Sequence, residues 1–157
     1  LLDADDAGDA WRPDDEDAHF ATYGTAHDFG TVVLSWDAVE EGIAVPDDGQ
    51  DTTLHEFAHM LDLATGEFDG TPMLDDYEDY KAWARVFTEH FEQLRYESDE
   101  DHVIDDYGAT NPAEFFAVAT EVFFEQPELL AEEAPDLYRQ MVKYFRIDPA
   151  EEERGPR

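Results

Sequence analysis

Apolar residues recur every three or four positions in four stretches of the chain, a spacing typical of helices that bury one face. The third stretch starts at Asn111-Pro112, where an N-cap residue precedes a proline in the first helical position. The pattern predicts helices over residues 52–65, 77–96, 111–124 and 135–145. In the first of them, one apolar stripe opposite two histidines consists of Leu54, Phe57, Ala58 and Leu61.

A strand pattern precedes these helices. Residues 31–36 combine β-branched and aromatic side chains and are the best strand candidate, whereas residues 45–51 have the composition of a turn. Irregular strands followed by helices, without βαβ alternation, are typical of an α+β fold with a small sheet packed on a helical body. We expect an acidic lead-in over residues 1–17, one domain over 18–147 and a frayed tail over 148–157.

The strongly negative charge of the chain indicates what kind of surface the protein has and which partners it disfavours. The net charge is −33 in 157 residues, yet the chain has 11 Phe, 7 Tyr and 3 Trp, more aromatics than disordered acidic segments usually carry. We interpret this as a folded domain adapted to multimolar salt, because about 1 M salt shortens the screening length to about 3 Å. Nucleic acid and anionic membranes are disfavoured as partners, since the electrostatic term opposes binding to both.

Further features of the composition bear on location and chemistry. Without cysteine the chain has no disulfide, no thiolate metal site and no thiol nucleophile. No apolar run approaches the roughly 20 residues that span a bilayer. The chain begins at Leu1 rather than at methionine, as expected if the natural amino-terminal region is missing. Nothing argues for a signal peptide, and we expect a cytoplasmic protein.

A candidate metal site lies in the first predicted helix. His55, Glu56 and His59 form an H-E-x-x-H motif, whose spacing places both imidazoles on one helix face, about one turn apart. The glutamate is suited to take a proton from metal-bound water, and one Zn²⁺ per chain is the expected cofactor. The alternative is a pair of surface histidines, with Glu56 completing a capping box with Thr53.

A zinc site needs a third protein ligand besides the two histidines, with the fourth position left to water. Glu114 and Glu121 share one face of the helix that begins near Asn111, seven residues apart, and either carboxylate is a candidate. Spacing favours Glu114 only slightly, and Asn111 and Glu114 also form a capping-box arrangement.

Two further residues are candidates for supporting roles. Tyr107, just ahead of that helix, could donate its phenol proton to an oxyanion during amide hydrolysis; a core or interfacial tyrosine is the alternative. Asp62, three residues after His59, either orients a histidine or is an ordinary surface aspartate.

The motifs and their order resemble a known family. The segments VVLSW (32–36), HEFAHMLD (55–62), DGTPML (69–74) and YGATNPAEFFAVATEVFFEQPELL (107–130) are similar to those of the Mlc titration factor A family. Its members are zinc metallopeptidases whose catalytic core is also similar to that of anthrax lethal factor. In the best-studied branch the protein shows aminopeptidase activity and binds a glucose-responsive repressor called Mlc. The resemblance covers about residues 30–145 and implies a zincin-like fold.

The resemblance also implies residue roles. His55, His59 and Glu114 would hold the zinc, Glu56 would be the catalytic base, and Tyr107 the catalytic tyrosine. The VVLSW segment would be an edge strand that pairs with an extended peptide substrate, beside the H-E-x-x-H helix and a second helix that bears the glutamate. Two features depart from the family pattern: the helical region ahead of this core is short or absent, and the surface is far more acidic.

These inferences leave two main hypotheses. The first is a zinc-dependent peptidase, with aminopeptidase-like action expected and Glu56 as general base. The alternative is a regulatory protein that binds and sequesters a transcriptional repressor or another protein, with little or no peptidase activity. A third, weaker hypothesis, an acidic cation-binding protein, lacks the D-x-[DN]-x-[DN]-G calcium loop that would support it.

Overall fold

A computed structural model describes residues 24–27, 31–97 and 102–154 of the chain. The predicted acidic lead-in at residues 1–17 lies outside these ranges. Across the described residues the fold is mostly helical, with one antiparallel pair of short strands. The strands are β1 (Gly24–His27) and β2 (Thr31–Leu34), paired so that Gly24 lies opposite Leu34 and His27 opposite Thr31.

The helices at the four predicted positions are all present, which confirms that part of the sequence analysis. They are α2 (Thr52–Leu63), α3 (Tyr77–Tyr96), α4 (Pro112–Glu125) and α6 (Pro135–Phe145). A short 3-10 helix, η1 (Asp106–Ala109), leads into α4. None of the helices among the described residues combines the length and the apolar character that crossing a membrane requires.

Three further helices correct the sequence analysis. The predicted strand ends at Leu34 and not at Trp36, because Ser35 takes the N-cap position of α1 (Trp36–Ala44). The segment between two prolines forms α5 (Pro127–Glu133), each proline occupying a first turn where its missing N–H costs no hydrogen bond. The predicted frayed tail instead contains α7 (Pro149–Arg154), anchored by Ala150, which is 3% exposed.

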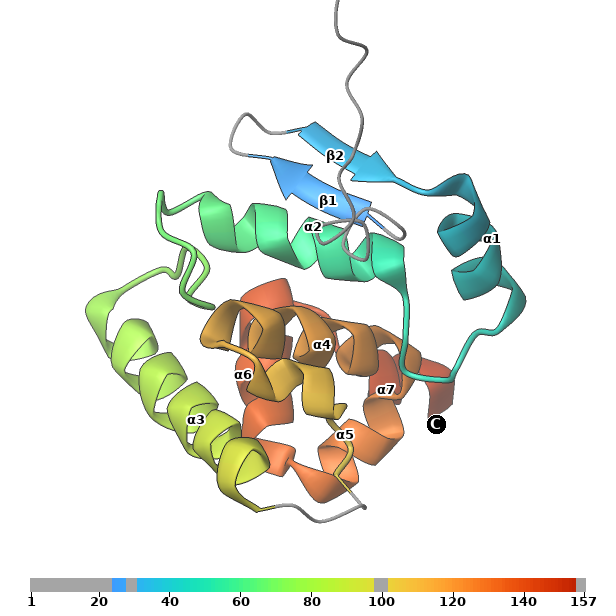
Figure 1. Ribbon diagram of the computed structural model, residues 1–157. Coiled ribbons are helices and arrows are strands. Elements are labelled where there is room, and N and C mark those ends of the chain that lie inside the picture. The colour runs from blue at the N-terminus through green and yellow to red at the C-terminus, as the bar shows by residue number, and fades with distance from the viewer. Residues whose placement is uncertain (1–23, 28–30, 98–101, 155–157) are drawn as a thin grey trace, which may run out of the picture.

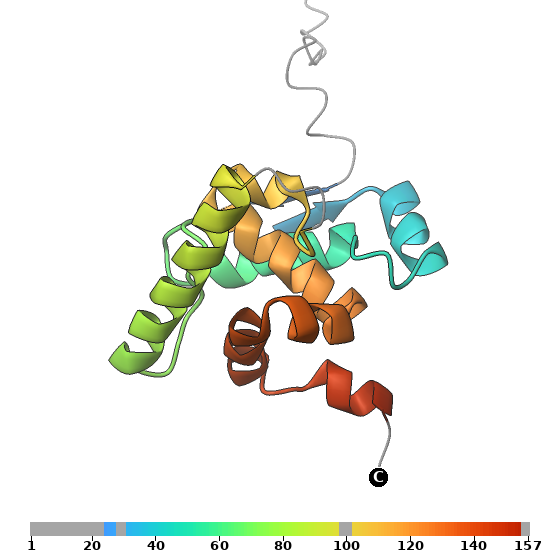
Figure 2. The same cartoon turned by 90° about the horizontal axis from the view of Figure 1, so that it is seen from below.

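The centre of the molecule is α4. Its residues from Phe115 to Phe123 are all buried, and α2, α3, α5, α6 and η1 all contact it. Figure 1 shows α2 between this helix and the β1–β2 hairpin, and Figure 2 shows α3 along one side, with α6 and α7 at the end away from the hairpin. A helix that is buried on nearly all sides usually has an apolar sequence throughout. The two buried polar residues of α4, Thr120 and Glu121, depart from this pattern.

The segment between α2 and α3 ties three helices together at Gly70. Its backbone N–H donates to Asp62 Oδ2 of α2 (2.9 Å), and its carbonyl accepts from Trp83 Nε1 of α3 (3.0 Å). The backbone of Gly70 has a φ of +77° and lies so close to α4 that a Cβ atom would be 2.2 Å from the carbonyl oxygen of Pro112. This segment therefore fixes α2 and α3 against the first turn of α4.

Candidate metal centre

The buried face of α2 is its polar face. Glu56 and His59 are each 6% exposed and Asp62 is 0% exposed, whereas Phe57 and Leu61 of the predicted apolar stripe are 54% and 37% exposed. Only Ala58 of that stripe is fully buried. Both histidines of α2 lie beside carboxylates of α4: His55 contacts Glu114 and Glu121, and His59 contacts Glu114.

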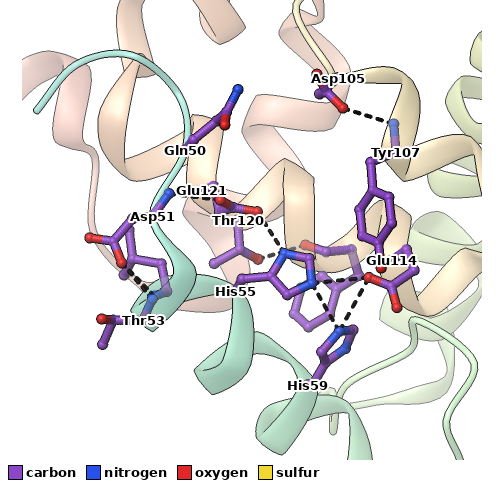
Figure 3. Close-up of polar contacts among 12 residues, drawn as sticks. Gln50, Asp51, Thr53, His55, His59, Asp105, Tyr107, Glu114, Thr120 and Glu121 are labelled. Carbon is purple, nitrogen blue, oxygen red and sulfur yellow. Dashed lines mark hydrogen bonds and ion pairs between the residues drawn. The ribbon is translucent and has the colours of Figure 1, made fainter. Parts of the chain in front are cut away.

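The start of α2 is capped by Asp51. Its Oδ1 accepts hydrogen bonds from the N–H groups of Thr53 (2.7 Å) and Leu54 (3.0 Å), so the hypothesis of a Thr53–Glu56 capping box is wrong. In α4, by contrast, Asn111 is the N-cap and accepts from the N–H of Glu114 (3.0 Å). The carboxylate of Glu114 does not return to the cap; it points to the histidines of α2 (Figure 3).

Three side chains converge between α2 and α4. Nε2 of His55 and Nε2 of His59 lie 3.1 Å apart, and Oε2 of Glu114 lies 3.0 Å from the first and 3.3 Å from the second. Figure 3 shows the two rings and the carboxylate directed at one point. Within the described residues, one nitrogen each of His55 and His59 and one oxygen of Glu114 are close enough together to bind the same metal ion.

The arrangement fits a tetrahedral zinc site. Ligand atoms about 2.0–2.1 Å from zinc at tetrahedral angles are about 3.3–3.4 Å from one another. The separations of 3.0, 3.1 and 3.3 Å are close to that edge length. Two neutral imidazoles and one carboxylate are also the ligand types that zinc prefers, with a fourth position open to water or substrate.

The other candidate for the third ligand, Glu121, lies on the far side of His55. Its Oε1 is 2.7 Å from Nδ1 of His55, and its Oε2 accepts from the N–H of Asp51 (2.7 Å). The structure thus brings both glutamates to the same histidine, Glu114 at Nε2 and Glu121 at Nδ1. From the sequence, Glu121 was only an alternative third ligand; its place on the same helix face as Glu114 was the signal for this contact.

Tyr107 of η1 borders the site and is 42% exposed. Its ring centroid lies 6.0 Å from that of His55. Burial raises the pKa of the Tyr107 phenol, and the charges of Glu114, Glu56 and Glu121 raise it further. The phenol is therefore protonated at neutral pH, as a hydrogen-bond donor must be.

The chain is similar to a known family of proteins. A model of the family described as "Glucose-regulated metallo-peptidase M90" matches residues 13–146. The chain belongs to this family. The resemblance to Mlc titration factor A that its motifs indicate is thereby confirmed.

Relatives of this M90 chain are identical to it at about a third or more of the aligned positions. An uncharacterized protein of Synechocystis sp. is 39% identical over 122 residues, 76% of this chain and 44% of that protein. Mlc titration factor A of Pectobacterium atrosepticum is 38% identical over 131 residues, 80% of this chain and 48% of that protein. The protein of that name in Serratia proteamaculans is 34% identical, with 80% and 49% covered. The M90 chain spans about half the length of these relatives.

In this M90 chain Asp62 does not orient a histidine through any contact that the structure describes. Its two carboxylate oxygens accept from the N–H groups of Gly70 (2.9 Å) and Thr71 (3.0 Å). The aspartate is fully buried and organises the segment that follows α2. Of the two interpretations offered for Asp62, neither holds, because it is a buried anchor of the loop.

Phe68, on the same segment, is a residue that sequence reasoning missed. Its ring lies 4.9 Å from that of His59, centroid to centroid, and the side chain is 48% exposed. It therefore gives the centre one apolar wall that faces solvent. No spacing relates Phe68 to the motif, so only the path of the loop reveals the contact.

The two histidine partners of Glu114 set the proton balance of the centre. Burial lowers the pKa of His55, but the hydrogen bonds and charges of Glu114 and Glu121 outweigh it and raise the pKa from 6.5 to about 9. For Glu114, burial raises the pKa, and the bonds to His55 and His59 outweigh it and lower the value to about 2. At neutral pH, without bound metal, His55 carries a proton and Glu114 does not.

Metal binding at pH 7 is therefore expected to release the proton that His55 carries, because a ligating imidazole nitrogen must be unprotonated. The apparent affinity should rise about tenfold per pH unit as the pH approaches 9. The pKa of His55 is higher in the folded chain than in the unfolded chain. Protonation of His55 therefore stabilises the metal-free fold; this stabilisation is complete below pH 6.5 and is lost as the pH rises through about 9. Calorimetric zinc titrations in buffers of different protonation enthalpy would count the proton; a count of zero at pH 7 contradicts this assignment.

Proposed function

We propose that this chain is the catalytic part of a zinc-dependent peptidase. The observation that carries the proposal is the convergence of His55, His59 and Glu114 at separations of 3.0–3.3 Å beside the buried Glu56. The matching family is described as a metallo-peptidase, which supports hydrolysis of peptide bonds as the reaction. The motif resemblance favours removal of amino-terminal residues over internal cleavage.

Zinc held by these three residues would lower the pKa of water to about 7 and polarise the scissile carbonyl. The chain itself would supply the proton transfers. Glu56 follows the ligand His55 directly and is buried, so its carboxylate is suited to accept a proton from the attacking water and to return it to the leaving amine. A carboxylate shielded from solvent keeps the proton within the site between the two steps.

Tyr107 would act on the other side of the reacting carbonyl. Its phenol borders His55 and Glu114 and keeps its proton, because burial and three carboxylates raise its pKa. Such a group can donate to the oxyanion that forms when water adds to the amide. An extended peptide would lie along the β1–β2 hairpin, which contacts α2, and its backbone would pair with β2.

The proposal is tested by hydrolysis of aminoacyl and internally quenched peptides in multimolar KCl. Zinc is first removed with a chelator and then added back at known stoichiometry. We expect turnover only with zinc, and the panel separates removal of amino-terminal residues from internal cleavage. A folded protein that binds zinc and cleaves no peptide contradicts the proposal.

Replacing Tyr107 by phenylalanine is expected to lower kcat about 100-fold, since the loss of one oxyanion donor typically costs 10²–10³-fold. KM and the zinc content should change little, because the ring remains. Tyr96→Phe is the matched control, as Tyr96 is 76% exposed at the end of α3. Equal kcat values for the Tyr107→Phe variant and the unmodified chain would remove Tyr107 from the mechanism.

A second candidate function is binding of a regulatory protein. The names of two relatives describe titration of a factor called Mlc, which favours this alternative. A pull-down from a host lysate would compare zinc-loaded, metal-free and Glu56→Gln forms of the chain. One protein recovered equally by all three forms, with no peptide hydrolysis by any of them, would favour the regulatory function over the peptidase.

A further inference from the structure

Glu121 uses both of its carboxylate oxygens on α2. Oε1 lies 2.7 Å from Nδ1 of His55, and Oε2 accepts the N–H of Asp51, the residue that caps this helix (2.7 Å). The residue is 7% exposed and, beside Thr120, lies in the mostly apolar middle of α4. A carboxylate in such surroundings costs stability unless its hydrogen bonds are satisfied, so its presence calls for a role.

We propose that Glu121 is a positioning residue that fixes the tautomer and the ring orientation of His55 for metal binding. The inference rests on the metal binding proposed above. An ionised carboxylate only accepts hydrogen bonds, so Nδ1 of His55 must carry the proton. Neutral His55 then has its lone pair on Nε2, the atom that lies 3.1 Å from Nε2 of His59 and 3.0 Å from Glu114.

The second hydrogen bond of Glu121 positions helix α2 as well as the ring of His55. By accepting the Asp51 N–H, the same carboxylate fixes the start of α2 against α4, four residues before His55. Rotation of the ring and movement of the helix are thus restrained by one side chain. Figure 3 shows Glu121 between Asp51 and His55, on the side of His55 away from His59.

His59 provides a contrast within the same centre. In the part of the chain that the structure describes, its buried Nδ1 has no hydrogen-bond partner, and its ring packs against Phe68. The orientation of His59 depends on ring packing, whereas that of His55 depends on a carboxylate. We therefore expect the His55 side of the centre to respond to changes in hydrogen bonding at position 121.

Glutamine at position 121 tests the idea because it keeps the shape of glutamate and changes its hydrogen bonding. An amide has one oxygen, so it can accept from Asp51 or from His55 but not from both. If the oxygen faces Asp51, the amide N–H₂ faces His55 and favours the tautomer with the proton on Nε2, which cannot bind metal. Zinc affinity should fall about 10- to 100-fold, the usual effect of losing such a partner.

Glu125→Gln is the matched control. Glu125 lies one turn further along α4 and accepts the N–H of Asp47 (2.9 Å), in the same segment before α2, without touching a histidine. Affinities are measured by competition with a chelator of known zinc affinity in multimolar KCl. We expect Glu121→Gln to bind zinc more weakly and Glu125→Gln to bind it as the unmodified chain does.

A spectroscopic measurement on the unmodified chain tests the tautomer without any variant. In the zinc-loaded protein, ¹⁵N-edited NMR of the histidine rings should show a His55 Nδ1 proton that exchanges slowly with solvent. Equal zinc affinity in Glu121→Gln, or no such proton in the unmodified chain, overturns the inference. A folded, unmodified chain that binds no zinc would instead contradict the proposed function itself.

Discussion

Glu56→Gln is expected to reduce peptide turnover by about 10³-fold or more while the protein keeps its zinc. Glutamine has the shape of glutamate but cannot take a proton from water, and general acid–base groups contribute about 10²–10⁴-fold. The three candidate ligands are unchanged, and their side chains contact one another directly. Turnover is measured under saturating substrate, with zinc content determined on the same sample.

A surface glutamate is the control for this substitution. Glu89→Gln on α3 removes an equal charge from a side chain that is 66% exposed, and it should leave turnover unchanged. If Glu56→Gln kept more than about a tenth of the turnover, Glu56 would not be the base. If it lost zinc together with activity, the residue would support the fold of the site rather than the proton transfer.

Gly70→Ala is expected to destabilise the fold by about 3–5 kcal/mol, a large effect for one substitution. The new Cβ would lie 2.2 Å from the Pro112 carbonyl oxygen and 2.7 Å from its carbon, both backbone atoms that cannot turn aside. The φ of +77° adds strain for any residue with a side chain. Relieving the clash would move the segment away from α4 and weaken its bonds to Asp62 and Trp83.

Gly66→Ala separates the effect of the clash with Pro112 from the effect of the backbone strain at positive φ. Gly66 also has a positive φ (+85°), but nothing lies within 4 Å of its Cβ position, so this variant carries only the backbone strain, about 1 kcal/mol. Thermal unfolding in the same salt should show a melting temperature about 10 °C or more lower for Gly70→Ala, and a drop of a few degrees for Gly66→Ala. Equal shifts in the two variants would contradict the close approach of Gly70 to α4.

Local patterns predicted the elements that carry the site. The helical positions of α2 and α4 follow from periodicity and from the Asn111-Pro112 start, and both were found where expected. The sequence missed α1 because aromatic Trp36 extends the β-rich run, and it missed α5 because Pro127 was read as a stop. In both cases one residue that favours a strand or a break also fits the first turn of a helix.

The sequence pattern did not predict which face of α2 is buried. Phe57 and Leu61 form an apolar stripe, yet both are exposed, while Glu56, His59 and Asp62 are buried. Hydrophobic pattern predicts burial only when the partner surface is apolar. Here the partner presents Glu114 and Glu121, whose hydrogen bonds with α2 compensate for removing polar groups from water.

The sequence by itself determined that His55 and His59 lie on one helix face, because residues four apart on a helix share a face whatever the rest of the chain does. It could not separate the roles of Glu114 and Glu121, since both lie on one face of α4. Only the tertiary structure placed the first at Nε2 of His55 and the second at Nδ1, across 59 and 66 residues of chain. That difference depends on how α4 packs along α2, which is set by non-local contacts such as those of Gly70 with Asp62, Trp83 and Pro112.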